Sequence, residues 1–215
     1  MSPSVPFLRA DIDPAALPQR EGIVQYLAAG RLEGDNGKYM KLYDRLAPLY
    51  DIGEKLADRF RYGRSIAAMR RAMMALPEWQ NGASVLYVSI GTGSDLAFLL
   101  AHTDLQSLNL VGADLSFGML RRARRKWQNL SNLSLIQCAA EDFPFADNSF
   151  DIVFHVGGIN FFSDKARALA EMFRVAKPGT LLMAADETQD LVDSQYKRHI
   201  FTKTPSATRK SICPP

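Results

Sequence analysis

The chain has 215 residues, of which 47% are hydrophobic and 23% are charged, and its formal net charge is +3. This length suits one large domain, and the composition excludes a mainly disordered chain, a collagen-like chain and a disulfide scaffold. The net charge is too small to favour a polyanionic partner such as nucleic acid. The longest apolar run, residues 96–101, is much shorter than the ~20 residues of a membrane-spanning helix, so we expect no membrane span.

The first residues and the cysteines favour a cytoplasmic protein. The chain begins with the sequence MSPS, without a basic segment followed by an apolar core, so we expect no secretory signal. The two thiols, Cys138 and Cys213, fit a reducing compartment. Neither the cysteines nor the histidines at positions 102, 155 and 199 have the spacing of metal ligands, so we expect no bound metal.

The N-terminal third of the chain has helical rather than strand periodicity. Residues 1–37 are rich in proline, and we expect an irregular or partly helical segment there. Residues 38–50 carry aromatic residues and leucines at helical spacing until a proline stops them. Residues 54–76 form a longer amphipathic helix, which Pro77 ends. We therefore expect residues 38–80 to form a helical, lid-like segment.

From residue 81 onward, strand-like and helix-like stretches alternate. The expected strands are residues 85–88, 108–113, 133–136, 150–154 and 180–185, and the expected helices are residues 94–102, 116–127 and 163–175. Strands that are separated by helices need crossover connections, which produce a parallel sheet with helices on both faces. We therefore expect residues 81–190 to form a doubly wound α/β domain of about five strands.

A glycine loop follows the first expected strand of this domain. Gly91, Thr92 and Gly93 lie between a strand and a helix, where ligands of open α/β sheets bind. Glycine allows a ligand to approach the backbone closely, and a helix N-terminus offers free N–H groups. Asp114 ends the second strand, about 20 residues after the loop, where a carboxylate can accept both ribose hydroxyls of an adenosine-type ligand. The alternative is an ordinary tight turn with a helix-capping aspartate.

The spacing of the glycines disfavours a nicotinamide-dependent oxidoreductase. A dinucleotide fingerprint requires Gly-x-Gly-x-x-Gly. Read from Gly91, the third position is Leu96, and read from position 89, the first residue is Ser89, so neither frame fits. The phosphate-binding pattern Gly-x-x-x-x-Gly-Lys-Ser/Thr is absent as well.

Five segments of the chain form an ordered series of motifs. They are residues 43–51 (YDRLAPLYD), 85–93 (VLYVSIGTG), 111–120 (VGADLSFGML), 140–151 (AEDFPFADNSFD) and 171–179 (EMFRVAKPG). In this order and at this spacing, they resemble the class I S-adenosylmethionine-dependent methyltransferases. Within that family the chain looks most like the ubiquinone/menaquinone-biosynthesis methyltransferase-like group, and the resemblance covers about residues 39–190.

The resemblance implies a Rossmann-like methyltransferase fold, S-adenosyl-L-methionine as the cofactor and a small-molecule methyl acceptor. A quinone-like or other aromatic or lipophilic acceptor is suggested by the resemblance alone. Carried over by position, the family's contacts are Gly91, Thr92 and Gly93 under the methionine part of the cofactor, Asp114 on the ribose, Leu115 and Met119 beside the adenine, Ala140 and Glu141 at the adenine edge, and His155 and Gly157 facing the cofactor and the substrate side.

Three positions depart from the family pattern. The family usually has an acid at the position of Tyr87, often a glycine at Ser89, and often an aspartate at Ala139. The change at Tyr87 removes an expected acceptor for the ammonium group of the cofactor. These departures favour the alternative of a degenerate methyltransferase-fold protein, which binds a cofactor or a partner without turnover.

The chemistry of methyl transfer needs little from the protein beyond alignment of donor and acceptor. A general base helps only where the acceptor must lose a proton, and His155 is the candidate because its ordinary pKa is near neutrality. The alternative is a polar residue that ends a strand. Tyr43 and Tyr50 lie two helical turns apart and could close over the cofactor or an aromatic acceptor on the substrate side, or simply pack a helix on the domain.

The C-terminal part of the chain also departs from the family. The family normally ends with an antiparallel strand pair beyond the fifth strand, whereas the residues after Asp186 lack strand periodicity. We therefore expect residues 191–215 to form a short, mostly irregular tail. An unprotected edge on the fifth strand would then favour self-association.

Overall fold

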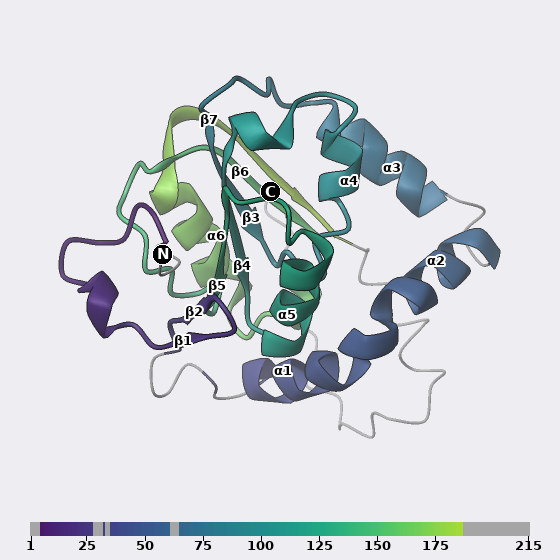
Figure 1. Ribbon diagram of the computed structural model, residues 1–215, viewed down its shortest axis with the longest axis horizontal. Coiled ribbons are helices and arrows are strands. Elements are labelled where there is room, and N and C mark those ends of the chain that lie inside the picture. The colour runs from purple at the N-terminus through teal and green to yellow at the C-terminus, as the bar shows by residue number, and fades with distance from the viewer. Residues whose placement is uncertain (1–4, 28–31, 33–34, 61–64, 187–215) are drawn as a thin grey trace, which may run out of the picture.

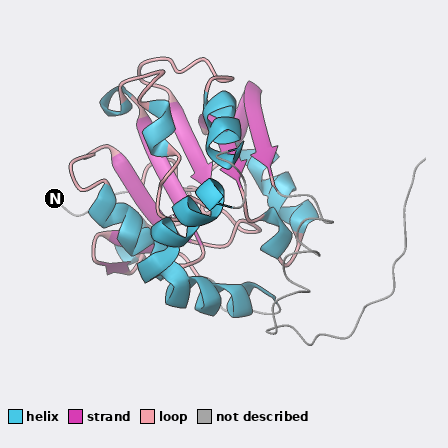
Figure 2. Cartoon of the chain, turned by 90° about the vertical axis from the view of Figure 1, so that its right-hand side faces the viewer, coloured by secondary structure: helices cyan, strands magenta, loops and turns pink. Residues whose placement is uncertain are grey.

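A seven-stranded sheet runs through the protein, and helices cover both of its faces (Figures 1 and 2). The computed structural model describes residues 5–27, 32, 35–60 and 65–186. The tail expected at residues 191–215, with Cys213 and His199, lies outside the described residues. The expectations for that tail stay predictions.

The order of the strands is that of a doubly wound sheet. The strands are β1 (Gln19–Arg20), β2 (Ile23–Gln25), β3 (Ser84–Val88), β4 (Asn109–Asp114), β5 (Leu133–Gln137), β6 (Phe150–Val156) and β7 (Ala176–Ala185). They lie in the order β1-β2-β5-β4-β3-β6-β7, and all neighbouring pairs are parallel except β1 and β2. The strand order reverses beside the central strand β3, which creates the switch point where such sheets bind ligands. The expected fold class is confirmed.

The central strand shows why a short apolar sequence becomes the middle of the sheet. All residues of β3 are buried. Val85 and Tyr87 pack on one face of the sheet, and Leu86 and Val88 pack on the other, as the two-residue period of a strand requires. A parallel strand that is covered on both faces needs this nearly continuous apolar run.

The helices form a layer on each side of the sheet. Helices α3 (Ser65–Met74), α4 (Leu96–Leu99) and α5 (Phe117–Lys126) pack on one face, and α6 (Lys165–Val175) packs on the other (Figure 1). Helix α4 is shorter than the helix expected over residues 94–102. Helices α1 (Asp35–Leu46) and α2 (Tyr50–Phe60) are joined by a single 3-10 turn, Ala47–Leu49, because Pro48 interrupts the helix.

The sheet has two more strands than expected, and both come from the N-terminal segment. Glu21 and Gly22 have φ values of 50° and 74° and form the tight turn between β1 and β2. Strand β2 then pairs in parallel with β5, with Val24 beside Ile136. Strands of two and three residues are too short to show a two-residue period, so their sequence carried no strand signal.

Strand β7 is longer than the strand expected over residues 180–185. It begins at Ala176 and includes Lys177, Pro178 and Gly179, although a Pro-Gly pair is more typical of a turn. The register between β6 and β7 shifts at this point, between Phe150 and Ile152, which accommodates the proline and a positive φ at the glycine. Among the described residues, β7 pairs only with β6, and self-association through this edge stays a prediction.

Candidate functional site

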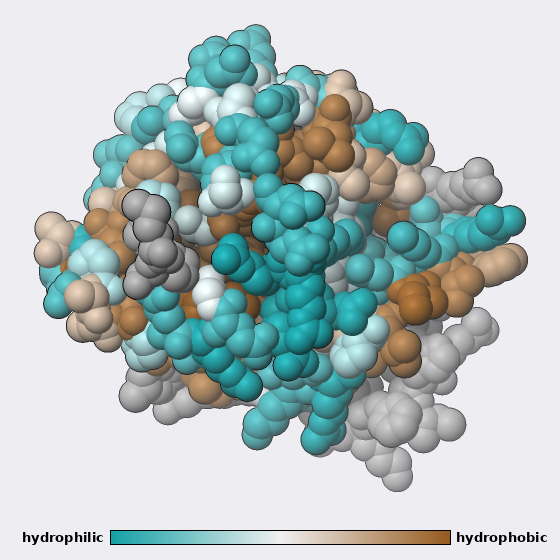
Figure 3. Space-filling model, in the orientation of Figure 1, coloured by the Kyte–Doolittle hydropathy of each residue, from teal (hydrophilic) through white to brown (hydrophobic). Residues whose placement is uncertain are grey.

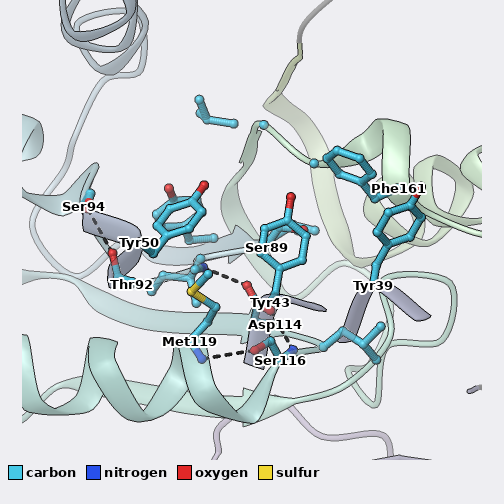
Figure 4. A pocket seen from close by; sticks show the side chains of 18 of the residues that line it. Tyr39, Tyr43, Tyr50, Ser89, Thr92, Ser94, Asp114, Ser116, Met119 and Phe161 are labelled. Atoms are coloured by element: carbon cyan, nitrogen blue, oxygen red, sulfur yellow. Dashed lines mark hydrogen bonds between the residues drawn. The ribbon is translucent and has the colours of Figure 1, made fainter. Parts of the chain in front are cut away.

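A cavity of about 850 Å3 lies at the carboxyl ends of the strands (Figure 4). Its floor, as we call it, consists of the lining residues within 88–95, 113–119, 138–141 and 156–158. The opposite side is formed by α3 and by residues 35–60, comprising α1, α2 and their connecting turn, which we call the lid. A cavity of this volume holds a nucleoside-sized ligand together with a second small molecule.

The loop after β3 has an unusual backbone. Ser89, Gly91 and Gly93 have φ values of 55°, 56° and 70°, in the left-handed region that favours glycine. A side chain at Gly91 would meet no other atom within 4 Å. The backbone at Gly91 and Thr92 therefore borders open space in the cavity, as a loop that receives a ligand should.

Gly93 packs closely against a neighbouring side chain. This residue does not line the cavity. A Cβ atom at Gly93 would lie 2.8 Å from Nε1 of Trp127, and the indole N–H of Trp127 donates a hydrogen bond of 2.9 Å to the Gly93 carbonyl. Close packing of the loop on Trp127, just after α5, therefore explains this glycine, and the expected ligand contact at Gly93 stays a prediction.

Asp114 lies at the end of β4 with its carboxylate at the cavity (Figure 4). Oδ2 accepts a hydrogen bond from the N–H of Gly91, and Oδ1 accepts one from the N–H of Ser116, each at 2.8 Å. Burial raises the pKa of Asp114 to about 6, although these two hydrogen bonds act against the shift. The carboxylate thus joins the glycine loop to the start of α5 while it borders the cavity.

Two aspartates attach the lid to the floor. Asp44 of α1 accepts hydrogen bonds from the Ser116 hydroxyl at 2.6 Å and from the Gly118 N–H at 2.8 Å, at the N-terminus of α5. Asp51 of α2 accepts a hydrogen bond of 2.5 Å from Thr92 of the glycine loop and lies 3.4 Å from the Lys126 ammonium group. The lid is therefore held by polar contacts at both ends of α5.

Aromatic rings form one wall of the cavity. Figure 4 shows Tyr39, Tyr43, Tyr50 and Phe161 gathered above Asp114 and Met119. The ring centroids of Tyr43 and Tyr50 are 6.2 Å apart, and those of Tyr39 and Phe161 are 4.7 Å apart. We call these four side chains the aromatic wall. Flat, slightly polar walls of this kind suit a planar ring as ligand.

Tyr87, at the position where the family has an acid, turns toward another carboxylate. Its ring is buried and stacks on Phe154 with centroids 4.2 Å apart. Its hydroxyl donates a hydrogen bond to Asp95, which is itself 1% exposed. Burial raises the pKa of Tyr87, and the nearby Asp95 carboxylate raises it further. Tyr87 is therefore a neutral donor, and the carboxyl group at this place belongs to Asp95.

Asp95 belongs to a small group of charged side chains at one end of the cavity. Nη1 of Arg70 lies 2.6 Å from Oε1 of Glu54 and 3.2 Å from Oδ1 of Asp95. We call Glu54, Arg70, Tyr87 and Asp95 the charge cluster, and all four side chains line the cavity. The cluster therefore contains two carboxyl groups and one guanidinium. Apart from its ion pair with Arg70, Oδ1 of Asp95 has no hydrogen-bond partner.

The residues after β5 have a more structural arrangement than expected. Ala139, Ala140 and Glu141 all line the cavity. However, Oε1 of Glu141 accepts hydrogen bonds from the Asn36 side chain and from the N–H of Ser163, at 3.2 and 3.0 Å. This carboxylate joins α1 to the start of α6, so its geometry does not favour the expected adenine contact.

His155 does not reach the cavity. The side chain is fully buried, its Nδ1 lies 3.3 Å from the Val88 carbonyl, and its ring packs beside Phe162. Burial lowers the pKa of His155, so the neutral imidazole is favoured. A general base must reach the acceptor, so this geometry disfavours the role that the sequence suggested for His155. Gly157, by contrast, lines the cavity as expected.

The structure thus brings most of the expected residues together and adds others. Of the residues that the sequence predicted as cofactor or substrate contacts, those that line the cavity are Gly91, Thr92, Asp114, Leu115, Met119, Ala140, Glu141, Tyr43, Tyr50 and Gly157. Sequence reasoning missed Asp44 and Asp51, although each directly follows one of the two tyrosines and has the same spacing. It also missed the ion pairs of Arg70, because no motif links α3 to the loop after β3.

Two negative findings concern the described part of the chain. Within it, no group of three or more histidine, cysteine, aspartate or glutamate side chains could hold a metal ion. None of the helices that the structure describes is both long and apolar enough to cross a membrane.

Comparisons with known proteins point to one family. Residues 86–184 match the family model described as a methyltransferase domain. The demethylmenaquinone methyltransferase of Listeria welshimeri is 33% identical over 159 residues, which are 71% of this chain and 63% of the relative. The ubiquinone/menaquinone biosynthesis C-methyltransferase UbiE of Pasteurella multocida is 35% identical over 125 residues, 57% of this chain and 46% of the relative. The chain therefore spans less than two thirds of the length of these relatives.

A solved structure shares the fold at low sequence identity. It is phosphoethanolamine N-methyltransferase 1 of Haemonchus contortus, in complex with phosphoethanolamine and S-adenosylhomocysteine. The TM-score is 0.59 at 14% identity, and the match covers 72% of this chain and 33% of that one. This similarity supports the fold alone.

Proposed function

We propose that the chain, which matches a methyltransferase domain over residues 86–184, is a class I, S-adenosylmethionine-dependent enzyme that transfers the methyl group of this cofactor to a small, lipophilic, aromatic acceptor. The observation that carries the proposal is the cavity at the switch point of the sheet. In it, the glycine loop and the Asp114 carboxylate face the aromatic wall. This arrangement offers one place for a nucleoside and another for a planar ring.

The floor fits the nucleoside half of the cofactor. Asp114 would accept hydrogen bonds from the ribose hydroxyls, and Leu115 and Met119 would flank the adenine. The backbone at Gly91 faces open space, so the methionine part can lie close to it. Glu141 is left out of this assignment because Oε1 of its carboxylate already accepts hydrogen bonds from Asn36 and Ser163.

The charge cluster fits the amino-acid end of the cofactor. An ammonium group is held well by a carboxylate acceptor, and Oδ1 of Asp95 has the Arg70 guanidinium beside it but no hydrogen bond to it. The cluster has two carboxyl groups to one guanidinium, a composition that favours a cation in this part of the cavity. Asp95 would thus provide the carboxylate that Tyr87 lacks. This arrangement weakens the main reason for the degenerate alternative, in which the protein binds without turnover.

When bound, S-adenosylmethionine supplies a methyl group on a positively charged sulfur. The protein has to hold the acceptor in line with that bond, because alignment is the largest contribution it can make. Tyr43 and Tyr50 lie on the lid, opposite Asp114 and Met119, so they would orient the acceptor ring against the cofactor. The lid also excludes water from the space between them.

The acceptor class is inferred from two sources. The relatives bear the names of menaquinone and ubiquinone biosynthesis methyltransferases. The aromatic wall independently suits a flat, apolar ring. We therefore propose a quinone-like acceptor. The buried free thiol of Cys138 fits a reducing compartment, so we also propose a cytoplasmic site of action.

Calorimetry tests the proposal most directly. S-adenosylmethionine and S-adenosylhomocysteine should bind, and NADH should not. A turnover assay with a reduced naphthoquinone then follows methyl transfer by mass spectrometry. Binding of NADH alone would contradict the proposed cofactor, and cofactor binding without any transfer to quinone-like acceptors would favour the degenerate alternative.

A further inference from the structure

The lid has an outer face whose composition is unusual for a helix of a globular protein. Residues 36–60 include both acidic and basic side chains, but only some of them are exposed. The exposed residues of this range are Lys38, Lys41, Leu42, Arg45, Leu46, Pro48, Leu49, Ile52, Gly53, Lys55, Leu56, Arg59 and Phe60. We call this set the outer face of the lid. Apart from one glycine, it consists of apolar and basic residues.

The apolar side chains of the outer face form a continuous stripe at helical spacing. Leu46, Leu49, Ile52, Leu56 and Phe60 are 46%, 69%, 57%, 51% and 77% exposed. Figure 3 shows the corresponding brown surface gathered over α2. Single exposed apolar residues are ordinary, but a contiguous stripe marks a surface that contacts something else.

The acidic side chains within residues 36–60 of the lid turn inward. Asp44 and Asp51 bind the floor, as described above, and Glu54 binds Arg70. Asp58 accepts hydrogen bonds from the backbone N–H groups of Ile66 and Ala67, at the start of α3. Every acid within residues 36–60 is thus used inside the molecule, and the outer face carries positive charge only.

The apolar stripe and the purely basic charge of the outer face together favour an anionic bilayer over a second copy of the chain as the partner. Two copies of the chain packed through this face would bring Lys55 and Arg59 of one copy close to the basic residues of the other, which is unfavourable. An anionic bilayer offers hydrocarbon for the apolar stripe and negative headgroups for the basic side chains that flank it. An amphipathic helix with lysine and arginine beside leucine and phenylalanine is the form that lies in a membrane interface.

We propose that the outer face of the lid docks on the surface of an anionic lipid bilayer. Leu56 and Phe60 enter the headgroup–acyl boundary, and Lys55 and Arg59 bind anionic headgroups. The contact is peripheral and reversible, because one amphipathic helix buries a limited apolar area.

Docking also gives the cavity an entrance from the lipid phase, an inference that rests on the proposed function. Leu46 and Leu49 belong to the outer face and also line the cavity. Met69 of α3, which is 48% exposed, lines the cavity as well. The apolar stripe is therefore continuous with the cavity lining. A lipophilic acceptor that is dissolved in the bilayer can reach the aromatic wall along these side chains without crossing water.

Co-sedimentation of the full chain with vesicles tests docking without cofactor or acceptor. Vesicles of phosphatidylcholine mixed with phosphatidylglycerol should bind the protein, and vesicles of phosphatidylcholine alone should bind it much less. Raising the salt from about 0.1 M to about 0.5 M should weaken binding, because headgroup attraction is screened. Leu56→Glu and Phe60→Glu should each reduce partitioning by about tenfold.

Phe173 provides the matched control. It is 66% exposed on α6, on the other side of the sheet, so Phe173→Glu should leave vesicle binding unchanged. Equal partitioning of Phe60→Glu and Phe173→Glu would overturn the proposal. So would a lack of vesicle binding, or a dimer in light scattering that Phe60→Glu abolishes. Calorimetry of S-adenosylhomocysteine with the same proteins keeps this result separate from the proposed function, because Leu56 and Phe60 lie outside the cavity.

Discussion

The floor and the lid of the cavity are held in place by different forces. The floor belongs to the loops of a sheet whose strands are buried in apolar side chains on both faces. The lid is attached by hydrogen bonds and ion pairs of its own acids, and it leaves its apolar stripe in solvent. Apolar packing resists separation, whereas polar contacts exchange readily with water. The comparison teaches that apolar packing holds the floor, whereas polar contacts of the lid's acids, together with the ring contact of Tyr39 with Phe161, hold the lid.

The largest expected effect is a difference in stability between two glycine-to-alanine substitutions, one in the floor and one in the lid. Gly93→Ala should lower the free energy of unfolding by about 2–4 kcal/mol, because the backbone has a positive φ and a Cβ would overlap Trp127. Gly53→Ala in α2 should instead stabilise the protein by up to about 1 kcal/mol, since alanine favours helix and no atom lies within 4 Å. Urea denaturation of both variants measures the difference. Equal stabilities would contradict the close packing of the floor.

The next effect concerns the ribose contact of the floor. Asp114→Ala should weaken binding of S-adenosylhomocysteine by about 1.5–3 kcal/mol, the usual contribution of hydrogen bonds to a charged group. Calorimetry measures the affinity, and a thermal melt controls for folding because Asp114 also binds Gly91 and Ser116. An unchanged dissociation constant in a folded variant would remove Asp114 from the cofactor site.

A smaller effect should appear at the charge cluster, where the floor meets the lid. Asp95→Asn should weaken binding of S-adenosylhomocysteine by about tenfold, because the ammonium group loses its ionic acceptor. The same variant should bind 5′-methylthioadenosine, which lacks the amino-acid part, as tightly as the parent does. Calorimetry with both ligands isolates the contribution. A loss that is equal for the two ligands would show that Asp95 acts on the fold rather than on the amino-acid end.

The smallest expected effect is a pH dependence of cofactor binding. The pKa of Asp114 is about 6 in the protein, and only the ionised carboxylate accepts both ribose hydroxyls. Affinity should therefore rise with pH through this range and level off above it, with a loss of about fourfold at pH ~5.5 relative to neutral pH. Asp114→Asn should flatten the profile. A parent profile that is level between pH 5 and 7 would contradict the role of this titration.

Several parts of the fold and site could be predicted because their signals are local. Buried parallel strands have nearly continuous apolar sequences, so residues 85–88 and 150–154 were recognisable as strands. The glycine loop and Asp114 follow such strands directly, and the topology of a parallel sheet brings strand ends together. The two short N-terminal strands could not be predicted, because pairing with β5 rather than their own sequence makes them strands.

The roles of individual polar side chains needed the tertiary structure. His155 and Asp95 are both polar residues near a strand or loop end, and the sequence favoured the histidine. The fold buries His155 away from the cavity and places Asp95 in it, beside Arg70 from a separate helix. Which face of a strand a residue occupies, and which distant charge it meets, depends on register and packing.

The sequence by itself determined the doubly wound sheet, the position of the glycine loop and the aspartate that faces it. Each depends on residues close together in the chain, and strand periodicity carries them to one edge of the sheet. Only the tertiary structure decided that the acids within residues 36–60 turn inward and that the apolar stripe turns outward. Helical periodicity defines two faces but does not say which one is buried, because that depends on the partner against which the helix packs.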